Sequence, residues 1–240
     1  MPLMTTPRDL LIVSLDVPSA HPVGQGDLSL ALAGAELVDL LRAGALVLDG
    51  DRIVPGAAPK APEALKDPKD PKDPEPPKDP ENPADPVDAA APADPAEPED
   101  ALLRAAGASL RREVPHESVE DWLWRRGNGL AAAYHSGLEA DGLLVRQRHP
   151  WIPVRTGRTA LVDSPARRRA AVRWRAGDPV LAGLAAALGI HDEPAEDFGS
   201  LADESLVTVL AAVHHAVAEL EAVRQRRSIE KAAFDNIWRG

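Results

Sequence analysis

One segment of the chain combines cations with an apolar loop, a pattern that could bind a membrane surface. The run Trp151-Ile152-Pro153-Val154 is flanked by four arginines, Arg146, Arg148, Arg155 and Arg158. The ring of a tryptophan can enter the lipid headgroup layer while nearby arginines meet anionic lipid. These five side chains are therefore candidate lipid-binding residues. The alternative is that Trp151 packs against a neighbouring helix and that the arginines pair with surface acids.

Charge is distributed unevenly along the chain. The formal net charge is −11, but residues 61–100 hold 4 Lys and 13 Asp or Glu, a balance of −9, which leaves about −2 for the rest. Residues 146–175 contain nine arginines and one acid, Asp163. After the loop, this segment predicts a helix lined with cations: Arg167, Arg168, Arg169, Arg173 and Arg175.

No group of residues in the sequence predicts catalysis. His214 and His215 are adjacent, so on a helix they point about 100° apart, and we expect no acid or histidine at i, i+4 to complete a zinc-type pair. The sequence has no Walker loop, GxGxxG or GxSxG motif. The glycines of VGQGD before a helix are only a weak anion-binding signal. We therefore predict a protein that is not an enzyme, without a metal site or cofactor.

Composition favours one sizeable core in a cytoplasmic protein. The 240 residues are 44% hydrophobic with only 3% aromatic and no cysteine, so Ala, Leu and Val must form the core. The N-terminus does not have the pattern of a signal peptide, and no apolar run approaches the roughly 20 residues that span a bilayer. Residues 56–98 repeat Lys-Asp-Pro and predict a disordered insert without a packing role. We expect a single domain over residues 1–240, interrupted by this insert.

Two segments with the same predicted order of elements must position the candidate residues. Residues 27–55 and residues 128–163 each predict a unit made of a helix, a glycine that ends it, and a β-hairpin. In the first, Asp27 is the predicted helix cap, Gly44 the C-terminal stop and Asp49-Gly50 the hairpin turn. In the second, Asn128 is the predicted cap, and the hairpin has a long irregular tip that contains Trp151.

The remaining elements are predicted to be helices. Start signals occur at Thr6-Pro7, Ser118, Ser164-Pro165 and Asp178-Pro179, and a further helix is expected near 100–112. A long helix from about residue 201 carries an apolar seam, followed by a separate last helix with Phe234 and Trp238. The seam consists of Leu206, Leu210, Val213, Val217 and Leu220. The fold class is thus mainly α, with a central apolar helix, amphipathic helices around it and two short β-hairpins.

Three segments together resemble the Golgi phosphoprotein 3 family, the 34-kDa Golgi peripheral membrane phosphoproteins. They are DLLIVSLD at 9–16, LALAGAELVDLLRAGALVLDGDRIV at 30–54 and GLEADGLLV at 137–145. The resemblance implies a mostly helical domain with a protruding apolar hairpin that helps oligomerisation. It also implies a peripheral membrane adaptor that binds phosphatidylinositol 4-phosphate. The Ala- and Arg-rich composition and short N-terminus are typical of a bacterial member.

The lipid site of the family uses a tryptophan and several basic residues, and this sequence departs from that pattern. The matching positions are Gly24, Ala33, Asn128 and Ala131. Arg125 and Arg126 lie one turn upstream and are candidates to substitute. We therefore expect little specific recognition of a 4-phosphate headgroup.

The sequence favours a non-enzymatic protein that binds an anionic phospholipid surface, peripheral on the inner face of the membrane. The sequence does not decide whether the ligand is a phosphoinositide, whether a protein partner binds, or whether the chain self-associates. The alternative is a winged-helix nucleic-acid binder. Against it, the helix near 28–43 offers only Arg42 as a cation beside Glu36 and Asp39, whereas DNA binding needs several phosphate contacts. We therefore expect no nucleic-acid partner.

Overall fold

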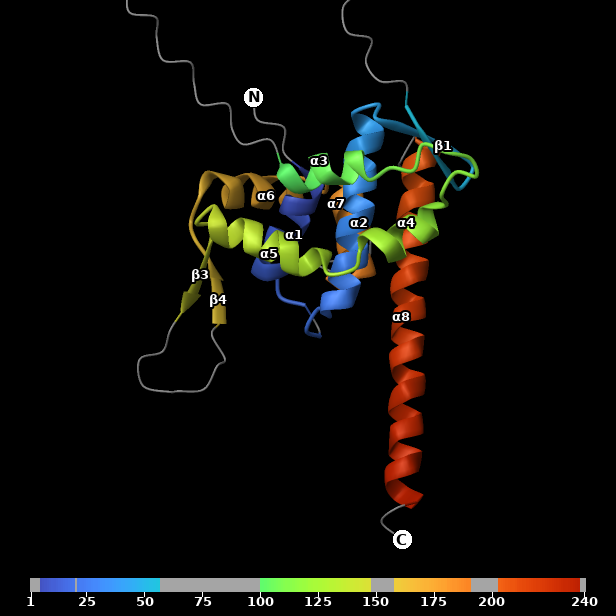
Figure 1. Cartoon of the computed structure of the whole chain (residues 1–240). Coiled ribbons are helices and arrows are strands. Elements are labelled where there is room, and N and C mark those ends of the chain that lie inside the picture. The colour runs from blue at the N-terminus through green and yellow to red at the C-terminus, as the bar shows by residue number, and fades with distance from the viewer. Residues whose placement is uncertain (1–4, 20, 57–99, 148–157, 191–202, 238–240) are drawn as a thin grey trace, which may run out of the picture.

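The structure is a computed structural model that describes residues 5–19, 21–56, 100–147, 158–190 and 203–237. Within these ranges the chain forms eight helices and two antiparallel hairpins, which confirms the mainly α expectation (Figure 1). The elements are α1 (Thr6–Asp16), α2 (Gln25–Arg42), β1 (Leu46–Asp49), β2 (Arg52–Pro55), α3 (Ala101–Ala108), α4 (Val119–Arg126), α5 (Leu130–Ala140), β3 (Leu144–Gln147), β4 (Arg158–Leu161), α6 (Pro165–Arg175), α7 (Pro179–Ala187) and α8 (Glu204–Ile237).

Helix α2 is the centre of the packing. It contacts α1, α4, α5, α7 and α8, and twelve of its eighteen residues are buried. Alanines and a glycine at 31, 33, 34 and 35 allow neighbouring helices to approach closely on several sides. The core is built largely of Leu, Ala and Val, as composition predicts, and Trp122 of α4 is its largest fully buried side chain.

The two helix–hairpin units form as the sequence predicts. Strands β1 and β2 pair from Leu46 opposite Pro55 to Asp49 opposite Arg52, after a helix stop at Gly44 with φ 67°. The two-residue turn is Gly50-Asp51, one position later than predicted, and Gly50 supplies the positive φ of 60°. Strands β3 and β4 form the second hairpin. The insert predicted at 56–98 lies, except for Gly56, outside the described residues.

Three predicted helix starts are wrong in detail. Helix α2 begins at Gln25, capped by Gly24, so Asp27 lies inside the first turn. Helix α5 is preceded by Gly129 rather than by Asn128. Thr5, not Thr6, occupies the cap position of α1; the Thr6 hydroxyl instead donates to Asp39 Oδ1 at 2.6 Å.

The predicted helix caps at Ser118, Ser164 and Asp178 are confirmed. The side chains of Ser118, Ser164 and Asp178 accept backbone N–H groups at the starts of α4, α6 and α7. The helix expected near 100–112 is shorter, and Asp100 accepts two of its N–H groups. These starts depend on residues three or fewer positions apart, which is why sequence reading finds them.

The long C-terminal helix differs from the prediction in one respect. It runs without interruption from Glu204 to Ile237, so no separate last helix follows it. Leu206, Leu210 and Val213 of the predicted seam are buried, whereas Val217 and Leu220 are only partly so. Beyond Leu220 most described side chains are exposed, and this end extends away from the helical body (Figure 1).

By length and composition, one helix in the described ranges could cross a membrane: the part of α8 from Glu204 to Ala232. The sequence prediction missed this segment because two histidines, four glutamates, three arginines and a lysine interrupt its apolar residues. Its buried positions, among them Val209, Val213 and Ala216, pack in the core. Core packing therefore accounts for part of its apolar character, and a single such helix is weak evidence for a membrane span.

Candidate functional site

The β3–β4 hairpin carries two of the candidate lipid-binding residues in its strands. Its register places Arg146 opposite Thr159 and Arg158 opposite Gln147. The root of the hairpin is fixed to the body: Leu144 is buried, and the Val162 amide donates to the Leu143 carbonyl at 2.9 Å. The other three hairpin candidates, Arg148, Trp151 and Arg155, lie outside the described residues.

Arginines of α6 are largely neutralised by acids of the same body. Arg167 pairs with Asp16 and Arg168 with Asp163 at 3.0 Å. Arg173 lies 3.0 Å from both Asp9 and Asp178 and is largely buried. Burial alone would raise the pKa of Asp178, but hydrogen bonds from Arg173 and from the Leu181 amide lower it overall. Arg173 therefore acts in the structure of the body, whereas Arg167 and Arg168 form surface ion pairs, as the alternative interpretation expects.

Arg125 is held in place by a buried acid. Its Nε lies 2.6 Å from Glu117 Oε1 and its Nη2 2.7 Å from Oε2, a bidentate pair. Nη2 also donates to the Ser109 carbonyl at 3.3 Å. The guanidinium lies 5.0 Å from the ring centroid of Trp122. Arg125 thus ties the segment before α4 onto the helix, which leaves little of its charge for a ligand.

Arg126 belongs to a second, more deeply buried network. Its Nε and Nη2 donate to the two carboxylate oxygens of Glu36 at 2.7 and 2.9 Å, and Nη2 also reaches the Leu102 carbonyl. The Tyr134 hydroxyl donates to Glu36 Oε1 at 3.0 Å. Burial raises the pKa of Glu36, against the opposing effects of Arg126 and Tyr134. Arg126 is thus the counter-charge of a glutamate in the central helix.

Positions that match the lipid site of the family are occupied by groups unsuited to bind a phosphate. Ala33 is fully buried, and its carbonyl accepts from Trp122 Nε1 at 3.4 Å. Ala131 is buried as well, and its amide donates to Ser29 Oγ. No cation can be offered from either position without displacing the core.

A cation does lie near the start of α2, and it comes from the long C-terminal helix, in which the sequence predicted only an apolar seam. Arg224 of α8 reaches over Gly24 and Gly26, and its Nη1 lies 2.7 Å from Asp27 Oδ2. The acid predicted to cap α2 therefore binds an arginine instead. No local signal could have found this pair, because 197 positions separate the two residues.

The two groups of candidate residues do not form one site. Figure 1 shows β3 and β4 on one side of the body and α4, which carries Arg125 and Arg126, on another. Arg125 and Arg126 are engaged in ion pairs with Glu117 and Glu36, whereas Arg146 and Arg158 stand in the strands of the β3–β4 hairpin. Any surface contact through these residues would thus be made at the hairpin.

The fold and this surface define a mainly helical protein with a central small-residue helix, two helix–hairpin units and a protruding arginine-bearing hairpin. The model of the Golgi phosphoprotein 3 (GPP34) family matches residues 7–232, and the chain belongs to this family. Searches among curated proteins and solved structures returned no match.

Proposed function

We propose that this chain is a non-enzymatic, peripheral membrane-surface binding protein that contacts anionic lipid through the hairpin at residues 146–158. Its membership of the Golgi phosphoprotein 3 family carries the proposal. The protruding β3–β4 hairpin, with an arginine in each strand, supports the choice of surface. The proposed location is cytoplasmic, at the inner face of the membrane, and the proposed role is that of an adaptor.

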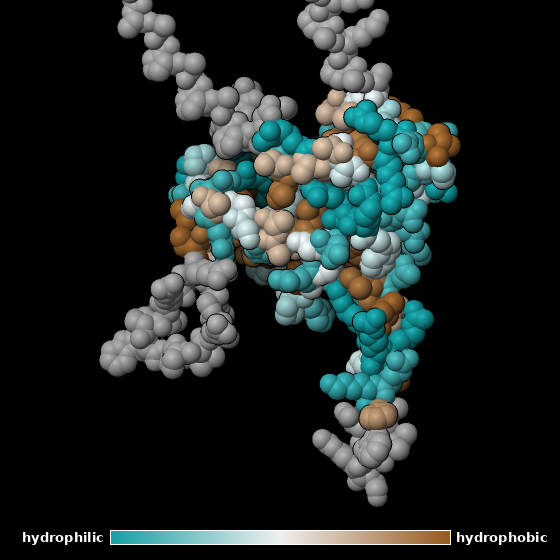
Figure 2. Space-filling view, in the orientation of Figure 1, coloured by the Kyte–Doolittle hydropathy of each residue, from teal (hydrophilic) through white to brown (hydrophobic). Residues whose placement is uncertain are grey.

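The free end of α8 adds cations on the same side of the body. Figure 1 shows this end extending in the same direction as the hairpin, and Figure 2 shows it as largely hydrophilic. Arg226, Arg227 and Lys231 are exposed there. A cation near an anionic membrane contributes about 1 kcal/mol, roughly a fivefold gain in affinity. Glu221 and Glu230, also exposed there, offset part of this charge, so the hairpin carries most of the proposed attraction.

Recognition of a specific phosphoinositide is not part of this proposal. The described residues at the family's headgroup positions are buried alanines, Gly24 and Asn128 rather than cations. Arg224, the cation that comes closest to Gly24, is already paired with Asp27. We therefore propose that binding follows surface charge and shows little preference for phosphatidylinositol 4-phosphate.

The winged-helix alternative places α2 in a nucleic-acid groove, and the burial of α2 does not favour it. Leu28, Leu32, Val38 and most positions between them are inaccessible. A helix that contacts α1, α3, α4, α5, α7 and α8 would have to leave the core to enter a groove.

Co-sedimentation with liposomes tests the proposal. Vesicles of neutral lipid, of generic anionic lipid, and of phosphatidylinositol 4-phosphate at matched surface charge are compared. We expect binding to both anionic vesicles, which weakens between 0.1 and 1 M salt as the Debye length falls from about 10 to about 3 Å. Changing Arg146, Arg148, Arg155 and Arg158 to Gln should abolish it.

A matched control changes four exposed arginines elsewhere, Arg42, Arg52, Arg111 and Arg112, to Gln. This variant has the same net charge as the hairpin variant and should keep most of the binding. Equal loss in both variants would show that total charge, not the hairpin, decides binding. Binding that survives the hairpin changes, or a strong preference for the 4-phosphate lipid, would overturn the proposal.

A further inference from the structure

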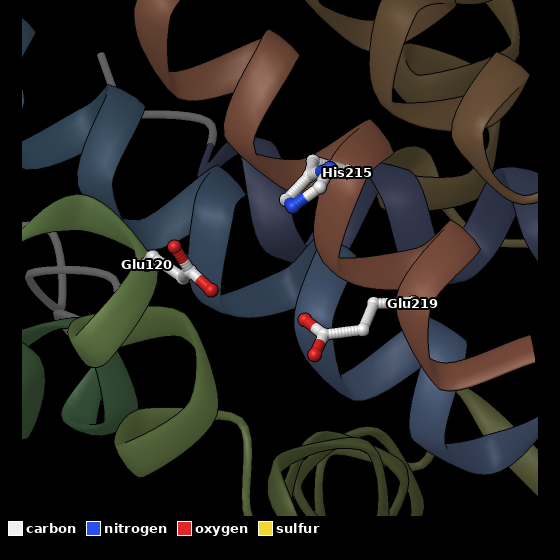
Figure 3. A group of neighbouring side chains, drawn as sticks. All are labelled: Glu120, His215 and Glu219. Carbon is white, nitrogen blue, oxygen red and sulfur yellow. The ribbon is translucent and has the colours of Figure 1, made fainter. Parts of the chain in front are cut away.

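Three side chains that the proposed function does not use meet at the junction of α4 and α8. Glu120 projects from the first turn of α4, and His215 and Glu219 project from α8 (Figure 3). Each offers one ligand atom, and the three atoms lie within 4.8 Å of one another. His215 and Glu219 are i, i+4 neighbours on one face of α8. This corrects the expectation that no acid stands four residues from either histidine.

The three groups have no partner in the described part of the chain. None of them takes part in a hydrogen bond or ion pair there, and all three are exposed to solvent. No described arginine or lysine pairs with either carboxylate, and the two lie at a distance where like charges repel. A bound cation would remove this repulsion, and its remaining coordination positions would be open to water.

The backbone that supports these side chains is fixed from beneath. In α4, Trp122 and Leu123 are fully buried behind Glu120, and in α8 Val213 and Ala216 are buried beside His215. The Ser118 hydroxyl accepts the Asp121 amide at 3.0 Å and holds the first turn of α4. Only side-chain rotations are thus needed to bring the three atoms to metal-ligand distances.

The donor set indicates which ions fit. One imidazole nitrogen with two carboxylate oxygens suits Zn²⁺ and its neighbours Co²⁺, Ni²⁺ and Cu²⁺, whereas Mg²⁺ and Ca²⁺ prefer oxygen alone. Three protein ligands with water completing the shell is a coordination that Zn²⁺ accepts. The partial positive charge at the start of α4 acts against a cation, but it is weak beside two carboxylates.

We propose that Glu120, His215 and Glu219 form a surface site for a divalent transition-metal ion of the Zn²⁺ type. The ion bridges α4 to α8. It thereby links two helices that are distant in sequence, since 95 positions separate Glu120 from His215. Its role is to stabilise this junction. The proposal does not rest on lipid binding, because none of its residues lies on the hairpin or among Arg226, Arg227 and Lys231 at the free end of α8.

Metal titration of the full, tag-free chain after treatment with EDTA tests the site. Co²⁺ is the probe, since its visible absorption reports nitrogen and oxygen ligation, and Zn²⁺ should displace it. We expect one equivalent to bind. Zn²⁺ should also raise the thermal midpoint by a few degrees, because the ion binds only where the two helices are assembled.

Single changes of the ligands locate the site. His215→Ala, Glu219→Gln and Glu120→Gln should each weaken binding at least about tenfold and remove the rise in thermal midpoint. Because the three side chains are exposed, the metal-free variants should unfold at the midpoint of the unmodified chain. Glu221→Gln, also exposed on α8, and His21→Ala are matched controls that should bind normally. Failure of the unmodified chain to bind Co²⁺, or undiminished binding by His215→Ala, would overturn the proposal.

Discussion

Gly34 of α2 faces Val213 of α8 with no space for a side chain between them. A Cβ placed on Gly34 would lie 2.3 Å from Val213 Cγ2, closer than real Cβ atoms approach their neighbours. Leu123 and Leu184 stand 3.7 Å away on other sides of the same position. The close approach of the two helices therefore depends on a residue without a side chain at position 34.

Gly34→Ala should destabilise the protein by about 1–3 kcal/mol, because overpacking outweighs the roughly 1 kcal/mol by which alanine favours a helix. Chemical denaturation measures the change. Gly137→Ala is the matched control, since a Cβ at that helical position would meet no atom within 4 Å beyond its chain neighbours and the adjacent backbone of its own helix. The control should be neutral or stabilising. The stability lost on Gly34→Ala should also be smaller in a Val213→Ala background. An equal loss of stability in both backgrounds would show that the contact with Val213 is not its cause.

Arg126→Gln should be strongly destabilising because it leaves the buried Glu36 carboxylate without its counter-charge. Breaking a buried pair in this way costs about 3–5 kcal/mol. The loss should depend on pH. Burial already raises the pKa of Glu36 above 4.5, and removing Arg126 raises it further, so the variant gains stability relative to the unmodified chain as Glu36 takes up a proton.

Urea unfolding at pH 7 and at pH 5 measures this dependence. The difference between variant and unmodified chain should be smaller at pH 5 than at pH 7. Arg112→Gln, an exposed change of the same type, should stay within about 0.5 kcal/mol at both values. A difference that does not vary with pH would mean that Glu36 is not the group left unpaired.

Replacing residues 58–97 by a short Gly/Ser linker should leave the fold intact. Their composition cannot bury enough apolar surface to form part of the core. The flanking contacts stay in place, because the Gly56 amide still reaches the Ala45 carbonyl and Asp100 still caps α3. A thermal scan should show a shift of no more than a few degrees. Loss of cooperative unfolding would show that the segment packs.

Local signals account for the parts of the fold that the sequence predicts well. The hairpin β1–β2 and the caps at Ser118, Ser164 and Asp178 each depend on residues a few positions apart. The predicted end of the long helix was wrong because the helix was expected to stop where its apolar seam stops. Between Glu204 and Ile237 the chain has neither glycine nor proline, and its Ala, Glu, Gln, Arg and Lys have high helix propensity, so nothing in this stretch ends the helix.

The environment of the candidate residues could not be predicted from local sequence, because it is set by distant parts of the chain. The Arg126–Glu36 pair joins residues 90 positions apart, and the sequence gives no sign that this arginine is already engaged. His215 and Glu219, in contrast, stand one helical turn apart and are recognisable by spacing alone. Only the third member, Glu120, needs the fold to bring it alongside.

The continuous course of α8 gives one helix two different stabilities. Between Val209 and Ala216 one face of the helix is buried in the core, so amide hydrogens in these turns should exchange with solvent only when the whole protein opens. Past Leu220 the same helix has few tertiary contacts, and a segment of this length is only marginally helical alone in water. Its end can fray and re-form while the core stays closed. A surface or partner that held this end would therefore lengthen the lifetime of the helix there without changing the stability of the core.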